Sequence, residues 1–339
     1  ILSSRKGYSR GCYLDVPHAW NSDIVPDHVG PRELLDYVPV QTEMEALMSN
    51  KQDIPQEVYE LYDAYCHGDI SRRAFFSGLG KYAVGGMTVT SLAACVKPGY
   101  AKQQTQPGAD GLYEEMLIYN SPNGAGEMEG YFVRPANAAG KLPGIVIIHE
   151  NRGLNPHIRD VTRRAAQAGF VAFAPDALYP LGGYPGNDDD GRAMQAKRDR
   201  EGMVQDFMAA AEFLRGHVAV NGKVGCVGFC FGGAVSNLMA VRQPWLSASV
   251  PYYGGWPTAD EAAQVQVPLQ IHLAGLDERV NAGWPDYKAA LDANSVSYEA
   301  YIYPGVNHGF HNDTTSRYDS EAAKLAWERT LDYFRLHLV

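Results

Sequence analysis

The chain has 339 residues, which is enough for one large domain or two smaller ones. Its formal net charge is −10 and it has no long basic run, so we expect no nucleic-acid partner. A membrane-spanning helix needs roughly 18 to 20 uninterrupted apolar residues, and the sequence has no such stretch, so we expect no integral membrane span.

Cysteine usage argues against a disulfide scaffold and against a zinc site. The five cysteines are scattered and odd in number, and they form no C-x-x-C pair. They are Cys12, Cys66, Cys95, Cys226 and Cys230. Cys226 falls inside an apolar strand-like run, and we interpret it as a small buried hydrophobic residue.

The first part of the chain shows little periodicity. Residues 1–43 are rich in turn formers, and one hypothesis places the natural start at Met44 or Met48. Residues 55–66 follow the apolar spacing of a short amphipathic helix.

A pair of arginines precedes an apolar stretch in this N-terminal part. Arg72 and Arg73 come before the run from Tyr82 to Val96. The pattern resembles a twin-arginine export signal, which predicts a periplasmic protein, and the context of Cys95 resembles a lipid attachment site. The alternative is a helical appendage packed on the main domain of a cytoplasmic protein.

A change of pattern at residue 112 indicates a domain boundary. Residues 102–111 have the composition of a flexible linker. We therefore expect an N-terminal appendage over residues 1–111 and one catalytic domain over residues 112–339.

In the second part, strand-like runs alternate with helix-like segments, which predicts a mostly parallel sheet of about eight strands with helices on both faces. The expected strands are Glu115–Tyr119, Glu129–Arg134, Gly144–His149, Phe170–Ala174, Lys223–Val227, Ala248–Tyr253, Leu269–Ala274 and Tyr298–Tyr303. The expected helices are Pro156–Ala168, Met203–Arg215, Gly232–Val241, Trp284–Ala293 and Ser320–His337. Right-handed crossovers would gather the carboxyl ends of the strands at one edge, where we expect the site.

The strongest chemical motif is a cysteine on a sharp turn. The sequence Gly228-Phe229-Cys230-Phe231-Gly232 follows a strand and opens a helix, as a nucleophile elbow requires. Glycines two residues before and after Cys230 leave room for the turn. The helix N-terminus favours the thiolate form of the thiol, and the thiolate is the nucleophile. Such a turn is also compatible with a buried cysteine or a phosphate loop, although no Walker lysine follows.

Two later residues complete a triad in the order nucleophile, acid, histidine. Asp277 and His308 each follow a predicted strand, at the edge that holds Cys230. Glu278 is an alternative to Asp277, and His311 is an alternative to His308.

The loop after the strand that ends at His149 predicts further parts of the site. In such an arrangement this loop supplies one oxyanion donor, and we assign that role to the backbone N–H of Asn151, paired with the N–H of Phe231. Glu150 would lie near the sulfur, where a carboxylate disfavours a thiolate or accepts the thiol proton. The alternative for Glu150 is a solvated loop acid.

Taken together, the run from Leu142 to Pro175, the elbow GKVGCVGFCFGG, the Asp277 turn and the sequence Asn307-His308-Gly309-Phe310 resemble bacterial dienelactone hydrolases, also called carboxymethylenebutenolidases. The resemblance implies an α/β-hydrolase fold, a Cys-His-Asp triad and a thioester intermediate. It implies that Glu150 switches the cysteine between thiol and thiolate, that the substrate is a small ester or lactone, and that no metal or organic cofactor takes part.

The sequence departs from that family at one position. Dienelactone hydrolases carry an arginine four residues after the catalytic histidine, and Asn312 stands there. A second substrate-binding arginine of the family corresponds to one of Arg192, Arg198 and Arg200. A neutral ester or lactone is therefore as good a substrate as dienelactone. The stretch Leu181–Gly191 before these arginines predicts a mobile rim over the pocket.

Two other function classes remain compatible with this sequence. One is a non-catalytic binding protein on the same fold, since a fold does not dictate a function. The other is a cysteine acyltransferase or peptidase. The sequence does not predict the oligomeric state.

Overall fold

A single sheet of eight strands organises the protein. The computed structural model describes residues 54–83, 88–100 and 103–339, and residues 50–339 form one compact unit. The sheet order is β1-β2-β4-β3-β5-β6-β7-β8. The strands are β1 (Leu112–Ser121), β2 (Gly126–Pro135), β3 (Leu142–Ile148), β4 (Val171–Pro175), β5 (Val220–Phe229), β6 (Ala248–Tyr252), β7 (Leu269–Ala274) and β8 (Tyr298–Tyr303).

The sheet is mostly parallel, as the alternating pattern predicts. Strand β2 pairs antiparallel with both β1 and β4, and every later neighbour pair is parallel. The hairpin between β1 and β2 needs only a short turn, whereas each parallel pair needs a crossover connection.

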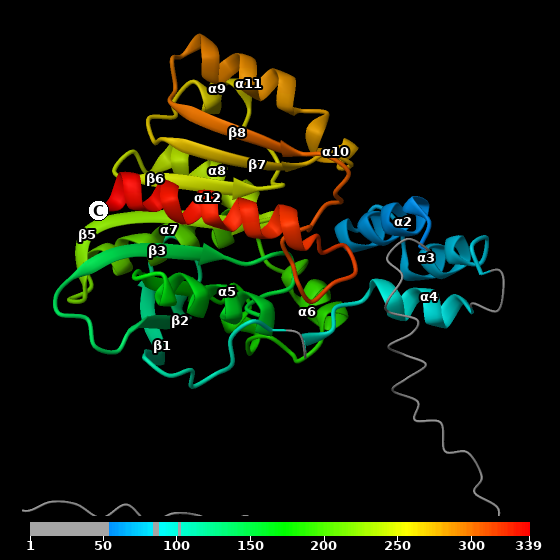
Figure 1. Cartoon of the computed structure of the whole chain (residues 1–339), viewed down its shortest axis with the longest axis horizontal. Coiled ribbons are helices and arrows are strands. Elements are labelled where there is room, and N and C mark those ends of the chain that lie inside the picture. The colour runs from blue at the N-terminus through cyan, green and yellow to red at the C-terminus, as the bar shows by residue number, and fades with distance from the viewer. Residues whose placement is uncertain (1–53, 84–87, 101–102) are drawn as a thin grey trace, which may run out of the picture. The chain divides into compact units, whose positions relative to one another are not determined.

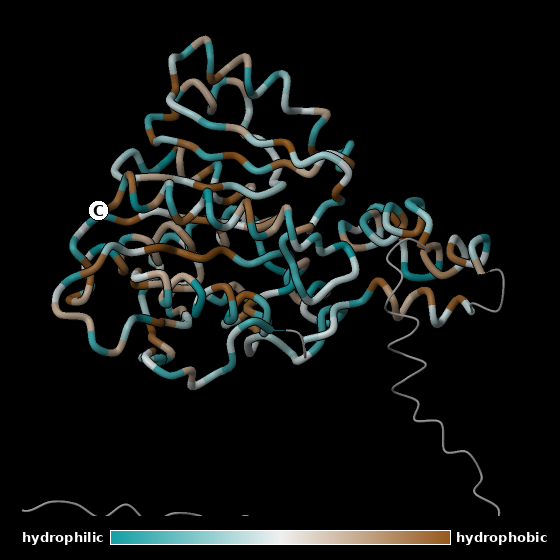
Figure 2. The backbone as a smooth tube through the Cα atoms, in the orientation of Figure 1, coloured by the Kyte–Doolittle hydropathy of each residue, from teal (hydrophilic) through white to brown (hydrophobic). Residues whose placement is uncertain are grey.

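Helices cover both faces of the sheet (Figure 1). The helices α7 (Arg200–Gly216), α8 (Phe231–Arg242) and α11 (Trp284–Ala293) bury their apolar residues in one core. The helices α5 (Pro156–Gln167) and α12 (Ser320–Leu338) pack in a second core on the opposite face. In β3, Val146 faces the first core and Ile147 the second. This alternation explains why the central strands read as continuous apolar runs, visible as brown segments in Figure 2.

Three helices before the sheet form a small cluster of their own. They are α2 (Gln56–His67), α3 (Arg72–Leu79) and α4 (Val89–Val96). Val58, Phe75 and Leu92, one from each helix, are buried together. The paired arginines of the export-like motif thus lie at the start of α3, after Ser71, whose side chain caps that helix. Export and lipid attachment at Cys95 stay predictions.

Two segments differ from the sequence-based interpretation. The stretch expected as a mobile rim, Leu181–Gly191, begins at the last residue of a 3₁₀ turn (Tyr179–Leu181), and from residue 188 it belongs to helix α6 (Asp188–Gln195). The side chain of Asn187 caps α6, and the three aspartates in its first turn interact favourably with the positive end of the helix dipole. In the sequence these signals for a helix were outweighed by the neighbouring glycines. In the expected linker, Thr105 is held by Asp160 of α5.

Other N-terminal expectations lie wholly or partly outside the described residues. These are the start at Met44 or Met48 and the middle of the apolar run, residues 84–87. Among the residues that the structure describes, no helix is both long enough and apolar enough to cross a membrane.

Candidate active site

Cys230 sits on a strained turn between β5 and α8. Its backbone has φ 56° and ψ −111°, a conformation that residues with a side chain rarely adopt. A Cβ on Gly228 would lie 1.9 Å from the carbonyl oxygen of Gly232, and a Cβ on Gly232 would lie 2.3 Å from that of Ile148. Both positions therefore require glycine, which is the steric reason for the G-x-C-x-G pattern.

Asp277 and His308 meet at the carboxyl edge of the sheet. Asp277 follows β7 and caps α10 (Glu278–Asn281) by accepting the N–H of Val280 at 3.1 Å. Its other oxygen lies 2.6 Å from Nδ1 of His308, which follows β8. Both side chains are buried. The contact fixes the ring so that Nε2 of His308 is the nitrogen left for chemistry, and Nε2 has no hydrogen-bond partner among the described residues.

The alternatives to these two residues lie elsewhere. His311 stacks on Phe229 with ring centroids 4.9 Å apart, and burial holds its pKa well below the usual range, so it stays neutral inside the core. His272 hydrogen-bonds Tyr303 and Gln270 within the sheet. Glu278 is exposed.

A second histidine, which the sequence analysis did not single out, contacts the sulfur. His67 is the last residue of α2, and its Nε2 lies 3.3 Å from Sγ of Cys230. Nδ1 of His67 lies 2.8 Å from the carbonyl oxygen of Asp63. One donor atom from each of His67, Cys230 and His308 lies within 4.8 Å of the others. No spacing rule could have found His67, because 163 residues separate it from Cys230.

The two imidazoles change the ionisation of the thiol. Burial by itself raises the pKa of Cys230, but His308 and His67 outweigh burial and lower it to about 5. Burial by itself lowers the pKa of His308, but Asp63, Asp277 and Cys230 outweigh burial and raise it to about 9. Near pH 7 the cluster therefore holds a thiolate beside imidazolium.

The same donor atoms have a spacing that soft metal ions also use. Their use in proton transfer, which the strained turn at Cys230 favours, stays a prediction.

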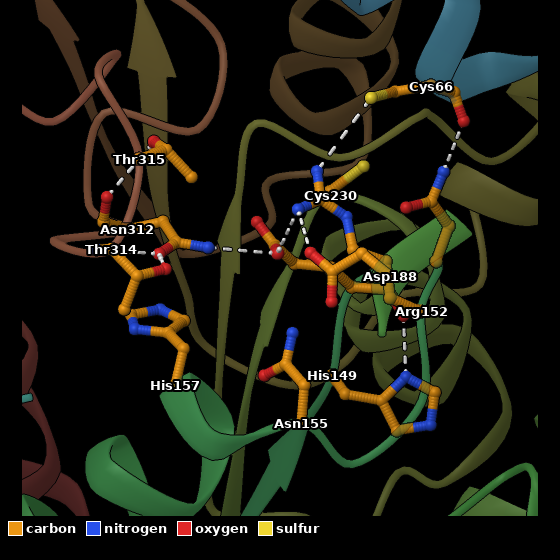
Figure 3. Close-up of polar contacts among 12 residues, drawn as sticks. Cys66, His149, Arg152, Asn155, His157, Asp188, Cys230, Asn312, Thr314 and Thr315 are labelled. Atoms are coloured by element: carbon orange, nitrogen blue, oxygen red, sulfur yellow. Dashed lines mark hydrogen bonds and ion pairs between the residues drawn. The ribbon is translucent and has the colours of Figure 1, made fainter. Parts of the chain in front are cut away.

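Glu150 belongs to a buried polar network, of which Figure 3 labels Arg152, Asp188 and Asn312. Its Oε2 accepts a hydrogen bond from Nδ2 of Asn312 at 3.1 Å and lies 4.0 Å from Nη1 of Arg152. Arg152 also pairs with Asp188 of α6 at 2.9 Å. The resemblance leads us to expect an arginine at position 312. The residue there is Asn312, and it contacts Glu150. The role of Glu150 as a thiol switch stays a prediction.

The predicted oxyanion donors flank the elbow. Phe231 is the first residue of α8, so its N–H has no partner inside the helix. The side chain of Asn151 donates to the carbonyl oxygen of Cys66 in α2, 2.6 Å away. Their roles as backbone donors stay predictions.

The three candidate arginines have different surroundings. Arg192 of α6 stacks over Tyr65 and lies 3.1 Å from Sγ of Cys66. Arg198 pairs with the buried Asp206 at 2.6 Å. Arg200 is the exposed first residue of α7. The structure therefore places Arg192 beside α2, where that helix meets the site, and ties Arg198 to the core.

A pocket of about 450 Å³ opens beside Asp277 and His308. Tyr59, Glu60 and Asp63 of α2 line one side, and Asp277, His308 and Arg317 line another. The helix α2 therefore forms a wall of the space from which a small molecule reaches His308.

Comparison with known proteins gives two family matches. Residues 128–338 match the model of the dienelactone hydrolase family, and residues 46–84 match a model described as YqhI-like. The second match includes the helices α2 and α3.

Individual relatives agree with the longer match. The hydrolase fragment YghX of Escherichia coli (strain K12) is 51% identical over 114 residues, which are 33% of this chain and 97% of that protein. A Bradyrhizobium protein, named as a lactonase for 2-oxo-3-(5-oxofuran-2-ylidene)propanoate, is 32% identical over 61% of this chain and 89% of its own length. A Klebsiella pneumoniae crystal structure assigned to the same hydrolases has a TM-score of 0.59 and 26% identity, covering 66% of this chain and 99% of that one.

Proposed function

The chain belongs to the dienelactone hydrolase family and has the α/β-hydrolase fold, and from that premise we propose that Cys230 is its nucleophile, with His308 as base and Asp277 as the residue that orients His308. The family membership makes it a hydrolase of lactones or carboxylic esters, as its relatives are.

The observation that carries the proposal is the position of the sulfur. Cys230 lies on an elbow with φ 56°, and the bonded pair of His308 and Asp277 lies beside it. A nucleophile, a base within reach and a third group that orients the base are the three parts of nucleophilic acyl transfer.

The reaction follows from this geometry in two stages. The Cys230 thiolate attacks the carbonyl carbon of the ester, and the C–O bond breaks, so that the acyl group stays on the sulfur as a thioester while the leaving oxygen takes the electron pair of that bond and a proton. Formation of the thioester removes the thiolate charge that helps to hold a proton on His308, so His308 can then take a proton from water. The resulting hydroxide attacks the thioester and releases the acid and the thiolate. The N–H groups of Phe231 and Asn151 would stabilise the negative oxygen in both stages.

Asn312 affects which substrates we expect the site to bind. An asparagine provides no positive charge for a substrate carboxylate, and here its amide is engaged by Glu150. We therefore infer that the substrate is a small ester or lactone and that Asn312 does not require a carboxylate on it. The lactonase name of the Bradyrhizobium relative supports a lactone.

The test compares substrate classes in the full chain. We expect hydrolysis of p-nitrophenyl acetate and γ-lactones, loss of both activities in Cys230→Ala, and no cleavage of N-acetyl dipeptides. Peptide cleavage that depends on Cys230 would indicate a peptidase instead. Mass spectrometry after rapid mixing would show an acetyl group on Cys230, and its absence from a protein that turns over would contradict the thioester step.

A further inference from the structure

The nucleophile lies between two histidines, of which the triad uses one. Nε2 of His67 lies 3.3 Å from Sγ of Cys230, on the side where α2 meets the elbow. The rings of His67 and His308 are edge to face, with centroids 5.1 Å apart and planes at 87°. His67 therefore lies within hydrogen-bond distance of the sulfur, and one ring nitrogen of His308 lies within 4.8 Å of it.

His67 is oriented much as His308 is. Its Nδ1 lies 2.8 Å from the carbonyl oxygen of Asp63 and 3.4 Å from the carboxylate of the same residue. Asp63 is in turn fixed by the buried Arg317, whose Nη1 lies 3.0 Å from it. Because Nδ1 is engaged by Asp63, Nε2 is the nitrogen that His67 presents to the sulfur. Asp63 thus orients His67 through its carbonyl oxygen and, at a longer distance, its carboxylate, whereas Asp277 orients His308 through its carboxylate.

Other charges also face His67. Nη2 of Arg279, from α10, lies 3.1 Å from the same Nε2. Burial by itself lowers the pKa of His67, but Cys230 and Asp63 outweigh burial and raise it to about 11. When the thiolate becomes a thioester, one of the two negative charges that hold the proton disappears while Arg279 remains. The proton then becomes easier to release.

We propose that Asp63 and His67 form a second acid–base pair for Cys230, which holds the thiol proton at rest and gives it to the leaving oxygen during acylation. This inference rests on the proposed function, in which Cys230 is the nucleophile. It makes α2 part of the active site.

Acylation couples bond changes at the ester to a proton transfer from His67. The S–C bond forms while the C–O bond breaks, and the electron pair of that bond goes to the leaving oxygen. This oxygen takes the Nε2 proton of His67, which gives a neutral alcohol and a neutral imidazole. The loss of the thiolate charge also lets the His308 imidazolium release its proton to solvent. In the second stage His308 removes a proton from water and keeps it, and His67 takes the proton of the carboxylic acid. The enzyme returns to thiolate and imidazolium.

The test compares two esters that differ in their leaving group. An alkoxide needs a proton to depart and a nitrophenolate does not. In the full chain, we expect His67→Gln to lower kcat/KM for ethyl butyrate by about 10²-fold, the lower end of general acid catalysis. The loss for p-nitrophenyl butyrate should be at least tenfold smaller. Asp63→Asn should act in the same direction, and His337→Gln at the end of α12 is the matched control.

Three results would overturn the inference. These are equal losses on the two esters, an unchanged His67→Gln enzyme, and a faster one, which would make α2 only a cover over the site. Cys230→Ala is measured in parallel. If that variant still hydrolyses both esters, the proposed function itself fails, whereas an inactive Cys230→Ala beside an unchanged His67→Gln removes only the second acid–base pair.

Discussion

Nδ1 of His308 lies 2.6 Å from Oδ2 of Asp277, and this contact joins the loop after β7 to the loop after β8. Both side chains are buried, so water competes little for either of them. The bond keeps one proton of His308 on Nδ1, so Nε2 is the nitrogen that releases and takes up the second proton.

The substitution Asp277→Asn should disable the base without removing it. The neutral amide would no longer stabilise the imidazolium or fix the tautomer of His308, so we expect kcat for p-nitrophenyl acetate to fall by about 10²-fold or more. Glu278→Gln, one residue further along and exposed, should keep the parent rate. A reversed result, in which only Glu278→Gln is impaired, would assign the acid to Glu278.

The ionisation of Cys230 predicts the acid limb of the pH profile. The pKa of the thiol is lowered to about 5, so the thiolate is lost as the pH falls through about 5. We expect kcat/KM and the rate of alkylation of Cys230 by iodoacetamide to fall together there. Alkylation is followed by peptide mass spectrometry, which separates Cys230 from the other cysteines. An alkylation midpoint near pH 8 to 9, the ordinary range of a free thiol, would mean that the histidines do not stabilise the thiolate.

The elbow should tolerate no side chain at Gly228. A Cβ there would lie 1.9 Å from the carbonyl oxygen of Gly232, so the turn would have to open. We expect Gly228→Ala to lower the free energy of unfolding by about 3 kcal/mol or more, the upper range for overpacking. Gly216→Ala, at the end of α7 where a Cβ meets open space, is the control and should change stability little. Urea denaturation measures both, and equal midpoints would contradict the steric account.

The buried pair of Arg152 and Asp188 should matter more for stability than a surface pair. Arg152→Met leaves Asp188 and Glu150 without their buried cation, and breaking such a pair costs about 3 to 5 kcal/mol. Arg335→Met breaks an exposed pair with Asp332 and should cost less than about 1 kcal/mol. Thermal denaturation compares the two variants, and similar melting temperatures would contradict the role of this network.

The sequence predicted the sheet because its central strands are buried on both faces and therefore read as apolar runs. It also predicted that Cys230, Asp277 and His308 would meet, since parallel strands bring their carboxyl ends to one edge. The structure places Asp277 and His308 in contact and Cys230 beside them. The contact between Asp277 and His308 was thus predictable from the order and position of the two residues, and their catalytic roles stay a proposal.

The sequence could not predict what α2 contributes. The helix over residues 55–66 was expected from its amphipathic spacing, but its docking depends on contacts such as Asn151 with Cys66 and Asp63 with Arg317. These contacts join residues far apart in the chain and leave no periodic pattern. Helix α6 was missed for a different reason, because a single N-cap and an acidic first turn were outweighed by neighbouring glycines.

The most direct test of the account is hydrolysis of p-nitrophenyl acetate by the full chain and by Cys230→Ala, Cys230→Ser and His308→Ala. The account predicts turnover by the parent and a loss of at least about 10²-fold in Cys230→Ala and His308→Ala, since each removes nucleophilic or general-base assistance. If all four proteins hydrolyse the ester at the same rate, Cys230 and His308 are not the catalytic residues and the assignment of the triad is wrong.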